Sequence, residues 1–101
     1  MTSQQRLVTY PAVLDDTENP PGIYDVFFPD VPGAITYGID KAEACQRASE
    51  VLGTILLDYP NLPTPTALAT VQSRYPSALV IMITTDLIKA QRETQEVFPD
   101  Q

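Results

Sequence analysis

Five carboxylates stand close together in the sequence, and their types and spacing are the first place to look for chemistry. They are Asp15, Asp16, Glu18, Asp25 and Asp30. Clustered carboxylates can hold a divalent cation through their oxygens. A calcium loop, however, requires acidic residues at alternate positions with a glycine and a distal glutamate, and this segment has no such layout. The pattern therefore predicts a solvated acidic turn, with no bound metal or other cofactor.

The rest of the sequence offers little to an enzyme. It contains no histidine, the side chain on which most acid-base and triad chemistry near neutral pH depends. The single cysteine, Cys45, lies beside an apolar helical stripe, where a lone cysteine usually serves as a small hydrophobic side chain. The four glycines are scattered and build no phosphate loop. We therefore predict a binding protein that is not an enzyme.

The charge of the chain indicates what kind of partner it would accept. The 13 acidic and 6 basic residues give a net charge of −7, and no basic residue occurs between positions 7 and 40. Tyrosines could stack on bases, but platforms for single-stranded nucleic acid need basic residues among the aromatic ones, so no direct nucleic-acid binding is expected. An acidic surface suits a basic partner, although the charge could equally serve solubility alone.

Length and composition bound the architecture. The chain has 101 residues, 44% of them hydrophobic, which is enough for one domain with one modest core. No apolar run in the sequence has the length of a membrane span or the flanks of a secretion signal, and one cysteine cannot form an internal disulfide. We therefore expect a single domain in the cytoplasm, without membrane association.

Three strands are predicted before the first helix. Residues 6–14 are rich in β-branched and aromatic side chains, and Pro11 would place this strand at a sheet edge or a bulge because proline cannot donate to a ladder. The acidic segment 15–22 combines Asp, Asn, Pro and Gly and predicts a hairpin turn before a second strand. A Pro-Asp-Val-Pro-Gly turn then leads to a short strand at 34–38. Together these elements predict a three-stranded antiparallel meander.

A long helix and a fourth strand complete the predicted fold. Asp40 and Glu43 form a D-x-x-E capping box, and apolar residues then recur at three- and four-residue spacing until a proline ends the helix. Residues 77–85 are apolar on both alternating faces, which predicts a central strand. Asp86 could cap a short C-terminal helix. The fold class is therefore α+β, with elements in the order β-β-β-α-β.

Four sequence segments carry a family resemblance. They are LVTYPAV at 7–13, YDVFFPDVPGAITYG at 24–38, DKAEACQRASEVLG at 40–53 and LPTPT at 62–66. A strand ending in Y-P-A, an F-P-D-x-P-G turn, a helix opening on D-x-x-E-A and a proline-rich exit follow one another in this order. The chain therefore resembles the N-terminal domain of HicB-type antitoxins over residues 7–66, and by pattern over 77–85.

The resemblance implies a partial, degraded ribonuclease H-like fold and a function without catalysis. In this family the domain binds and blocks a small basic HicA-type toxin, an endoribonuclease that acts on messenger RNA. Residues 7–13 agree, since they contain none of the carboxylates with which a ribonuclease H site holds magnesium. The resemblance also gives the net charge of −7 a use, because an acidic antitoxin attracts a basic toxin.

The end of the chain departs from the family pattern. Full-length members commonly carry a C-terminal helix-turn-helix or ribbon-helix-helix module that dimerises on operator DNA. Residues 86–101 are too few for such a module. We therefore expect one HicB-like domain over residues 1–101, with its core at about 6–85 and a short tail, and no sequence-specific DNA binding by this chain.

The expected partners are a toxin and a second copy of the chain. The predicted toxin contacts are Asp15, Asp16, Glu18 and Asp30, with the exposed edge of the meander as a second candidate. A homo-dimer or higher homo-oligomer is expected because a four-stranded sheet leaves at least one edge to be covered. The alternative is an orphan HicB-like interaction or scaffold module without a toxin. A neighbouring gene for a small basic protein would favour the antitoxin.

Overall fold

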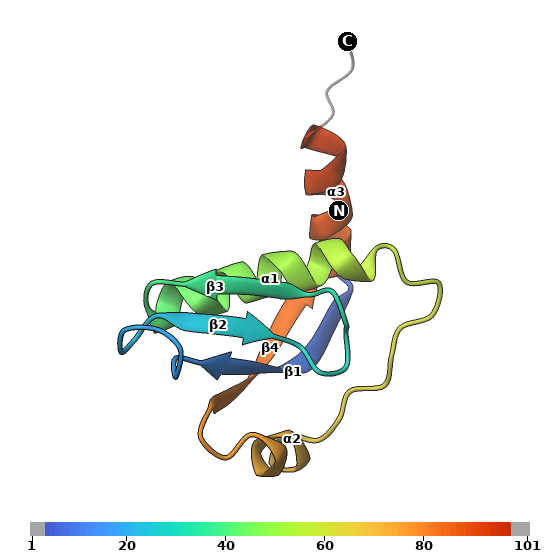
Figure 1. Ribbon diagram of the computed structural model, residues 1–101. Helices are drawn as coiled ribbons and strands as arrows, with labels where there is room; N and C mark the ends of the chain where they lie inside the picture. Colours follow the sequence, from blue (N-terminus) through green and yellow to red (C-terminus); the bar gives the residue numbers. More distant parts are fainter. Residues whose placement is uncertain (1–3, 98–101) are drawn as a thin grey trace.

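The computed structural model describes residues 4–97 and, among these, the side chains of residues 4–94. A four-stranded antiparallel sheet forms its centre, and one helix extends away from the end of the last strand (Figure 1). The elements are β1 (Leu7–Asp15), β2 (Tyr24–Phe27), β3 (Ile35–Gly38), α1 (Lys41–Leu56), α2 (Leu68–Arg74), β4 (Leu79–Asp86) and α3 (Leu87–Val97). The predicted α+β class and the order β-β-β-α-β are confirmed, with α2 added before β4.

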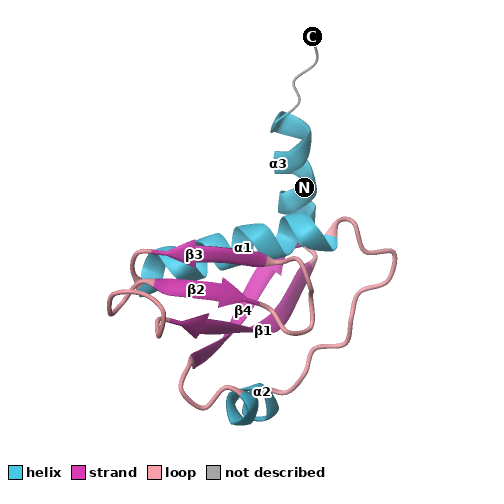
Figure 2. Cartoon of the chain, viewed as in Figure 1, coloured by secondary structure: helices cyan, strands magenta, loops and turns pink. Residues whose placement is uncertain are grey.

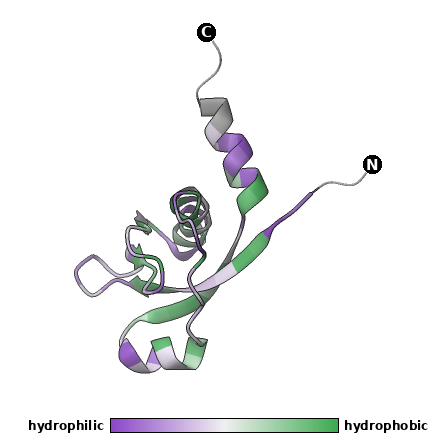
Figure 3. Ribbon diagram, turned by 90° about the vertical axis from the view of Figure 1, so that its right-hand side faces the viewer, coloured by the Kyte–Doolittle hydropathy of each residue, from purple (hydrophilic) through white to green (hydrophobic). Residues whose placement is uncertain are grey.

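Helices cover both faces of the sheet (Figure 2). Side chains alternate along a strand, so Tyr10 and Leu14 of β1 pack in the larger core under α1, whereas Val13 faces the other way. On that second face Val13 and Val80 form a small cluster with Val71 of α2. Figure 3, turned by 90°, shows α1 nearly end-on on one side of the strands and α2 on the other.

The lateral order of the strands is β3-β2-β1-β4, which corrects one prediction. The strand at 77–85 was expected in the centre of the sheet, but β4 lies at its edge. Its sequence is apolar at successive positions because one set of side chains, including Ile83, packs under α1, while Val80 packs with α2. An apolar run reports that both faces of a strand are covered and does not report its lateral neighbours.

Pro11 lies in an inner strand, yet at a point where that strand has only one neighbour. β1 pairs with β4 from Leu7 to Leu14, but β2 reaches only Val13 and the two residues after it. Pro11 lies opposite Met82 of β4 and beyond the end of β2. The prediction of an edge strand or a bulge is therefore wrong, since β1 is an inner strand. At Pro11, however, β1 has no neighbour on the β2 side, and a residue without an N–H is tolerated there.

The long helix begins as the sequence predicts. The Glu43 backbone N–H donates to Asp40 Oδ1 at 2.8 Å, and the Ile39 N–H donates to Glu43 Oε1 at 2.8 Å, which completes the capping box. The apolar stripe of α1 then packs on the sheet. Its fully buried residues are Ala44, Ala48, Leu52, Gly53 and Leu56.

Two further helices complete the chain. The seven-residue α2 lies in a stretch for which no element was predicted. It has no side-chain N-cap, so only the burial of Val71 marks it. The predicted C-terminal helix is confirmed as α3, with Asp86 Oδ1 accepting the Ile88 N–H at 3.0 Å; Phe98, which was expected within it, lies outside the described residues. None of the helices in residues 4–97 combines the length and the apolarity needed to cross a membrane.

Candidate functional site

Carboxylates gather at the turn that joins β1 to β2. Asp15 Oδ1 accepts a hydrogen bond from the Thr17 backbone N–H at 2.9 Å, and Asp16 Oδ2 accepts one from the Gly22 N–H at 3.2 Å. The Thr17 donors hold the pKa of Asp15 below its ordinary value. Glu18 belongs to the same turn and is exposed. Two of these three predicted contacts therefore shape the turn and remain accessible to a partner.

A fourth carboxylate, Asp25, lies directly across from Asp15. The register pairs Asp15 with Asp25 and Asp25 with Tyr37 of β3, so the three side chains form a row across the sheet on the face opposite α1. Like charges directly opposite each other destabilise a sheet, so a cation from a partner would relieve this pair. The alternation in Tyr-Asp-Val-Phe was the signal that could have assigned Asp25 to the predicted contacts, since its apolar neighbours face the core.

Exposed apolar side chains border this row. Tyr37 is 52% exposed, and Ile35, the other outward-facing residue of β3, is 66% exposed. The next residue, Gly38, faces the other way, toward α1, where an added Cβ would meet the backbone of Ala44. We name this combined acidic and apolar surface the hairpin patch, and it comprises Asp15, Asp16, Glu18, Asp25, Ile35 and Tyr37.

The outer edge of β3, the second predicted contact region, is partly covered by α1. Arg47 Nη1 donates to the Tyr37 carbonyl at 3.5 Å, and the guanidinium carbon lies 5.1 Å from the centre of the Tyr37 ring. Glu43 accepts the Ile39 N–H and pairs with Arg47 at 3.4 Å. Two backbone groups that an added strand could use, the Tyr37 carbonyl and the Ile39 N–H, are therefore engaged, which favours contact through side chains over strand addition here.

Asp30 lies apart from the hairpin patch. It follows β2 in the turn to β3, at the opposite end of β2 from the acidic turn (Figure 1). Its Oδ2 accepts the Thr66 N–H at 2.7 Å, and its Oδ1 accepts the Thr66 hydroxyl at 2.6 Å. The Tyr10 hydroxyl donates to the carbonyl of Pro63 in the same linker at 2.6 Å. The structure therefore gathers the other three predicted contacts and separates Asp30 from them.

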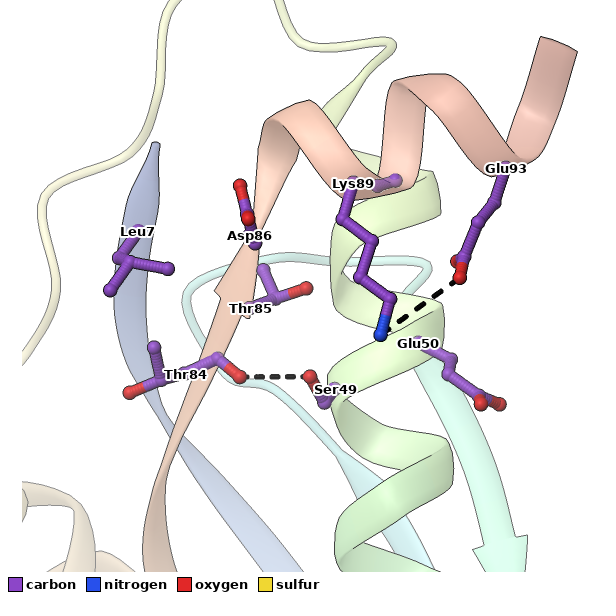
Figure 4. A pocket seen from close by; sticks show the side chains of 9 residues that line it. Leu7, Ser49, Glu50, Thr84, Thr85, Asp86, Lys89 and Glu93 are labelled. Carbon is purple, nitrogen blue, oxygen red and sulfur yellow. Dashed lines mark hydrogen bonds and ion pairs between the residues drawn. The ribbon is translucent and has the colours of Figure 1, made fainter. Parts of the chain in front are cut away.

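A shallow hollow of about 230 Å³ lies between α1, β4 and the start of α3 (Figure 4). The Ser49 hydroxyl donates to the Thr84 carbonyl at 2.8 Å, and Lys89 lies 4.0 Å from Glu93. These polar groups satisfy one another. Among the side chains of residues 4–94, no three His, Cys, Asp or Glu lie close enough together to hold a metal ion.

Comparison with known proteins gave structural relatives only. Neither a model of a known protein family nor a curated protein sequence matches this chain. A chain of a toxin-antitoxin complex from Streptococcus pneumoniae has a TM-score of 0.66 and 27% identity, and the match covers 83% of this chain and 72% of that one. The N-terminal domain of the Burkholderia pseudomallei antitoxin HicB has a TM-score of 0.60 and 18% identity, over 75% of this chain and 95% of that one.

The fold therefore falls in the class of small α+β domains found in toxin-antitoxin systems. Within that class the chain has the fold of the HicB N-terminal domain. The resemblance to HicB-type antitoxins, first noted in the order of the sequence motifs, is confirmed.

Proposed function

We propose that this protein is an antitoxin that binds and neutralises a small basic HicA-type mRNA endoribonuclease, and that the hairpin patch is its contact surface. The observation that carries the proposal is the pairing of carboxylates with exposed apolar side chains on one face of an antitoxin-type fold. Asp15 and Asp25 lie opposite each other, and Tyr37 extends the same row.

This surface chemistry fits a basic partner with an apolar contact region. Ile35 and Tyr37 would be desolvated on binding, and aromatic side chains are enriched among the residues that dominate interface energies. The carboxylates would pair with cations at the border and raise the encounter rate through opposite fields. Such a partner loses its own positive surface to the antitoxin, and that surface is what an RNA-cleaving protein offers to its substrate.

The first test reverses charges that do not hold the turn. Because Asp15 and Asp16 accept turn hydrogen bonds, their reversal would disturb the loop as well as the field. We expect the double variant Glu18→Lys, Asp25→Lys to slow association with the HicA-type protein by about tenfold or more at low salt, since steered encounters gain 10 to 10³ from complementary charge. Biolayer interferometry at two salt concentrations would measure the association rate constants.

The matched control places the same charge change elsewhere. Asp58 and Glu93 are exposed and lie just after α1 and in α3, so Asp58→Lys, Glu93→Lys changes the net charge equally on another surface. The control should slow association much less. Equal slowing by both variants would mean that only net charge matters, and would remove the hairpin patch from the interface.

Two further expectations accompany the proposal. With a net charge of −7, the chain of 101 residues by itself should not bind its operator DNA, and a salt-sensitive gel shift would contradict this. The alternative is an orphan HicB-like interaction or scaffold module without a toxin. Pull-down from the native host at low and moderate salt would favour this alternative if it recovered only this chain and no small basic protein.

A further inference from the structure

The sheet has two outer edges, and they differ in how well they are protected. β3 is a four-residue strand whose Tyr37 carbonyl is taken by Arg47, and the adjoining Ile39 N–H is taken by Glu43. β4 is an eight-residue strand at the other edge, and residues 77–85 contain no charged side chain and no proline. Natural proteins protect exposed edges with short strands, charges or prolines, and β4 has no proline and no charged residue before Asp86 at its last position.

The hydrogen-bond pattern identifies which β4 groups face outward. The Leu87 N–H donates to the Arg6 carbonyl at 2.8 Å, which extends the β1–β4 ladder by one pair. Antiparallel ladders alternate between hydrogen-bonded and non-hydrogen-bonded pairs. Counting back from Leu87, the backbone groups of Val80 and Met82 point away from β1, and Pro11, which has no N–H, lies at the non-hydrogen-bonded position opposite Met82.

Side chains already occupy both ends of this outward row. The Ser49 hydroxyl donates to the Thr84 carbonyl at 2.8 Å (Figure 4), and Gln72 donates to the Ala78 carbonyl, just before β4, at 3.0 Å. The open stretch between them contains Val80 and Met82, and Met82 is 38% exposed. The part of β4 that is free to accept another strand is therefore its first half.

We propose that this open stretch of β4 pairs antiparallel with the same stretch of a second copy of the chain. The register that leaves the Ser49 bond intact puts Val80 opposite Met82 of the second copy, and Met82 opposite its Val80, with Ile81 on the two-fold axis. An antiparallel strand paired with itself satisfies two-fold symmetry, and the two sheets become one continuous sheet.

The lack of charge favours a second copy over a basic partner at this edge. Two copies with a net charge of −7 repel each other wherever acidic surfaces meet, and residues 77–85 form an uncharged segment where they can approach. A basic partner would gain no electrostatic attraction from this uncharged edge, whereas it would at the hairpin patch. β3 and β4 lie at opposite edges of the sheet, so the two surfaces can be occupied together.

Backbone hydrogen exchange of the full chain, measured at low and high protein concentration, tests this pairing directly. We expect the amides of Val80 and Met82 to become protected as concentration rises, because only the second copy can accept their hydrogen bonds. The amides of Ile81 and Ile83 point toward β1 and should be protected at both concentrations. Sedimentation equilibrium on the same samples would follow the monomer–dimer transition.

A charge at the open edge should weaken the dimer. Met82→Lys adds the residue that natural edge strands use, and it lowers the net negative charge, so a loss of association cannot be due to greater overall repulsion. We expect the dimer dissociation constant to rise about tenfold or more. The control Leu57→Lys makes the same charge change at a side chain that is 37% exposed and lies outside the sheet, and it should leave the constant unchanged.

Three results would overturn the pairing: a chain that is monomeric at every concentration, a dimer in which Val80 and Met82 exchange as fast as in dilute solution, or a dimer that Met82→Lys does not weaken. Protection of these two amides only after a basic protein is added would assign the edge to that partner instead. The outcome is independent of the proposed function, because Met82→Lys leaves the hairpin patch intact and Glu18→Lys, Asp25→Lys leaves β4 intact.

Discussion

Gly53 lies inside α1, where a glycine makes a helix less stable than alanine by about 1 kcal/mol. The structure shows why a glycine stands here, since side chains of β4 and α3 approach it closely. A Cβ at Gly53 would lie 2.8 Å from the hydroxyl oxygen of Thr85 and 2.9 Å from the Cβ of Ala90. The short helix–strand and helix–helix distances around α1 therefore require this glycine.

Gly53→Ala should destabilise the protein despite the better helix former. Neither Thr85 nor Ala90 has a flexible side chain that can move aside, so overpacking of about 1–3 kcal/mol outweighs the helix gain of about 1 kcal/mol. Because both contacts are shorter than 3.0 Å, we expect an overpacking cost of about 2–3 kcal/mol and therefore a net loss of about 1–2 kcal/mol in the free energy of unfolding by urea. The exposed neighbour is the control, since Thr54→Ala should be neutral or slightly stabilising. A Gly53→Ala variant as stable as the parent would mean that α3 shifts freely.

At the scale of elements, the linker between α1 and α2 is held to the sheet by single side chains. Residues 57–67 contain no helix or strand, yet Asp30 binds Thr66 through both carboxylate oxygens, and the Tyr10 hydroxyl binds Pro63. Burial, and after it the charge of Asp30, raises the pKa of Tyr10. The linker therefore carries the chain from one face of the sheet to the other along a fixed path.

Asp30→Ala should release this linker. Hydrogen bonds to a charged acceptor contribute about 1.5–3 kcal/mol to stability. Because Asp30 is only half-buried, we expect the free energy of unfolding to fall by about 1–2 kcal/mol. We also expect thermolysin to cleave the linker faster. Thr66→Val removes only the hydrogen bond of the hydroxyl group and should lower the free energy of unfolding by less. If both variants match the parent in urea unfolding and in cleavage rate, Asp30 does not hold the linker. Its role as a toxin contact stays a separate prediction.

At the scale of the whole molecule, carboxylates dominate the surface charge and couple stability to pH. The backbone N–H of Thr17 lowers the pKa of Asp15, and the backbone N–H of Arg6 lowers the pKa of Asp86. A carboxylate with a lower pKa in the folded state stabilises the fold above its unfolded pKa. That contribution is lost as the pH falls through the folded value.

Acidification should therefore weaken the fold through these two groups. We expect the free energy of unfolding of the parent to fall more steeply below the ordinary aspartate pKa than that of Asp15→Asn, Asp86→Asn. Urea unfolding of both proteins across a pH series measures the difference between them, which removes the shared effect of overall charge. Parallel curves would show that neither carboxylate couples folding to protons.

Local patterns in the sequence determined the elements and which face of each is buried. The capping box at Asp40, the apolar stripe of α1 and the β-branched and aromatic residues of the first strand are local patterns, and the structure confirms the element that each predicts. The acidic turn at 15–22 was also predicted from local residue types, its Asp, Asn, Pro and Gly residues. The weakly capped α2 was missed because one buried valine is too little periodicity to recognise.

Only the tertiary structure decided the place of β4 in the sheet and the composition of the hairpin patch, whereas the meander of β1, β2 and β3 was predicted from the turns. Periodicity does not encode which strand lies beside which, so β4 proved to be an edge, Asp25 and Tyr37 joined Asp15 in one row, and Asp30 lay elsewhere. These relations depend on pairing between residues distant in sequence, which the cooperative packing of the whole sheet fixes. The place of a carboxylate in the sequence therefore predicted the turn in which it lies, whereas its neighbours in space depend on the fold.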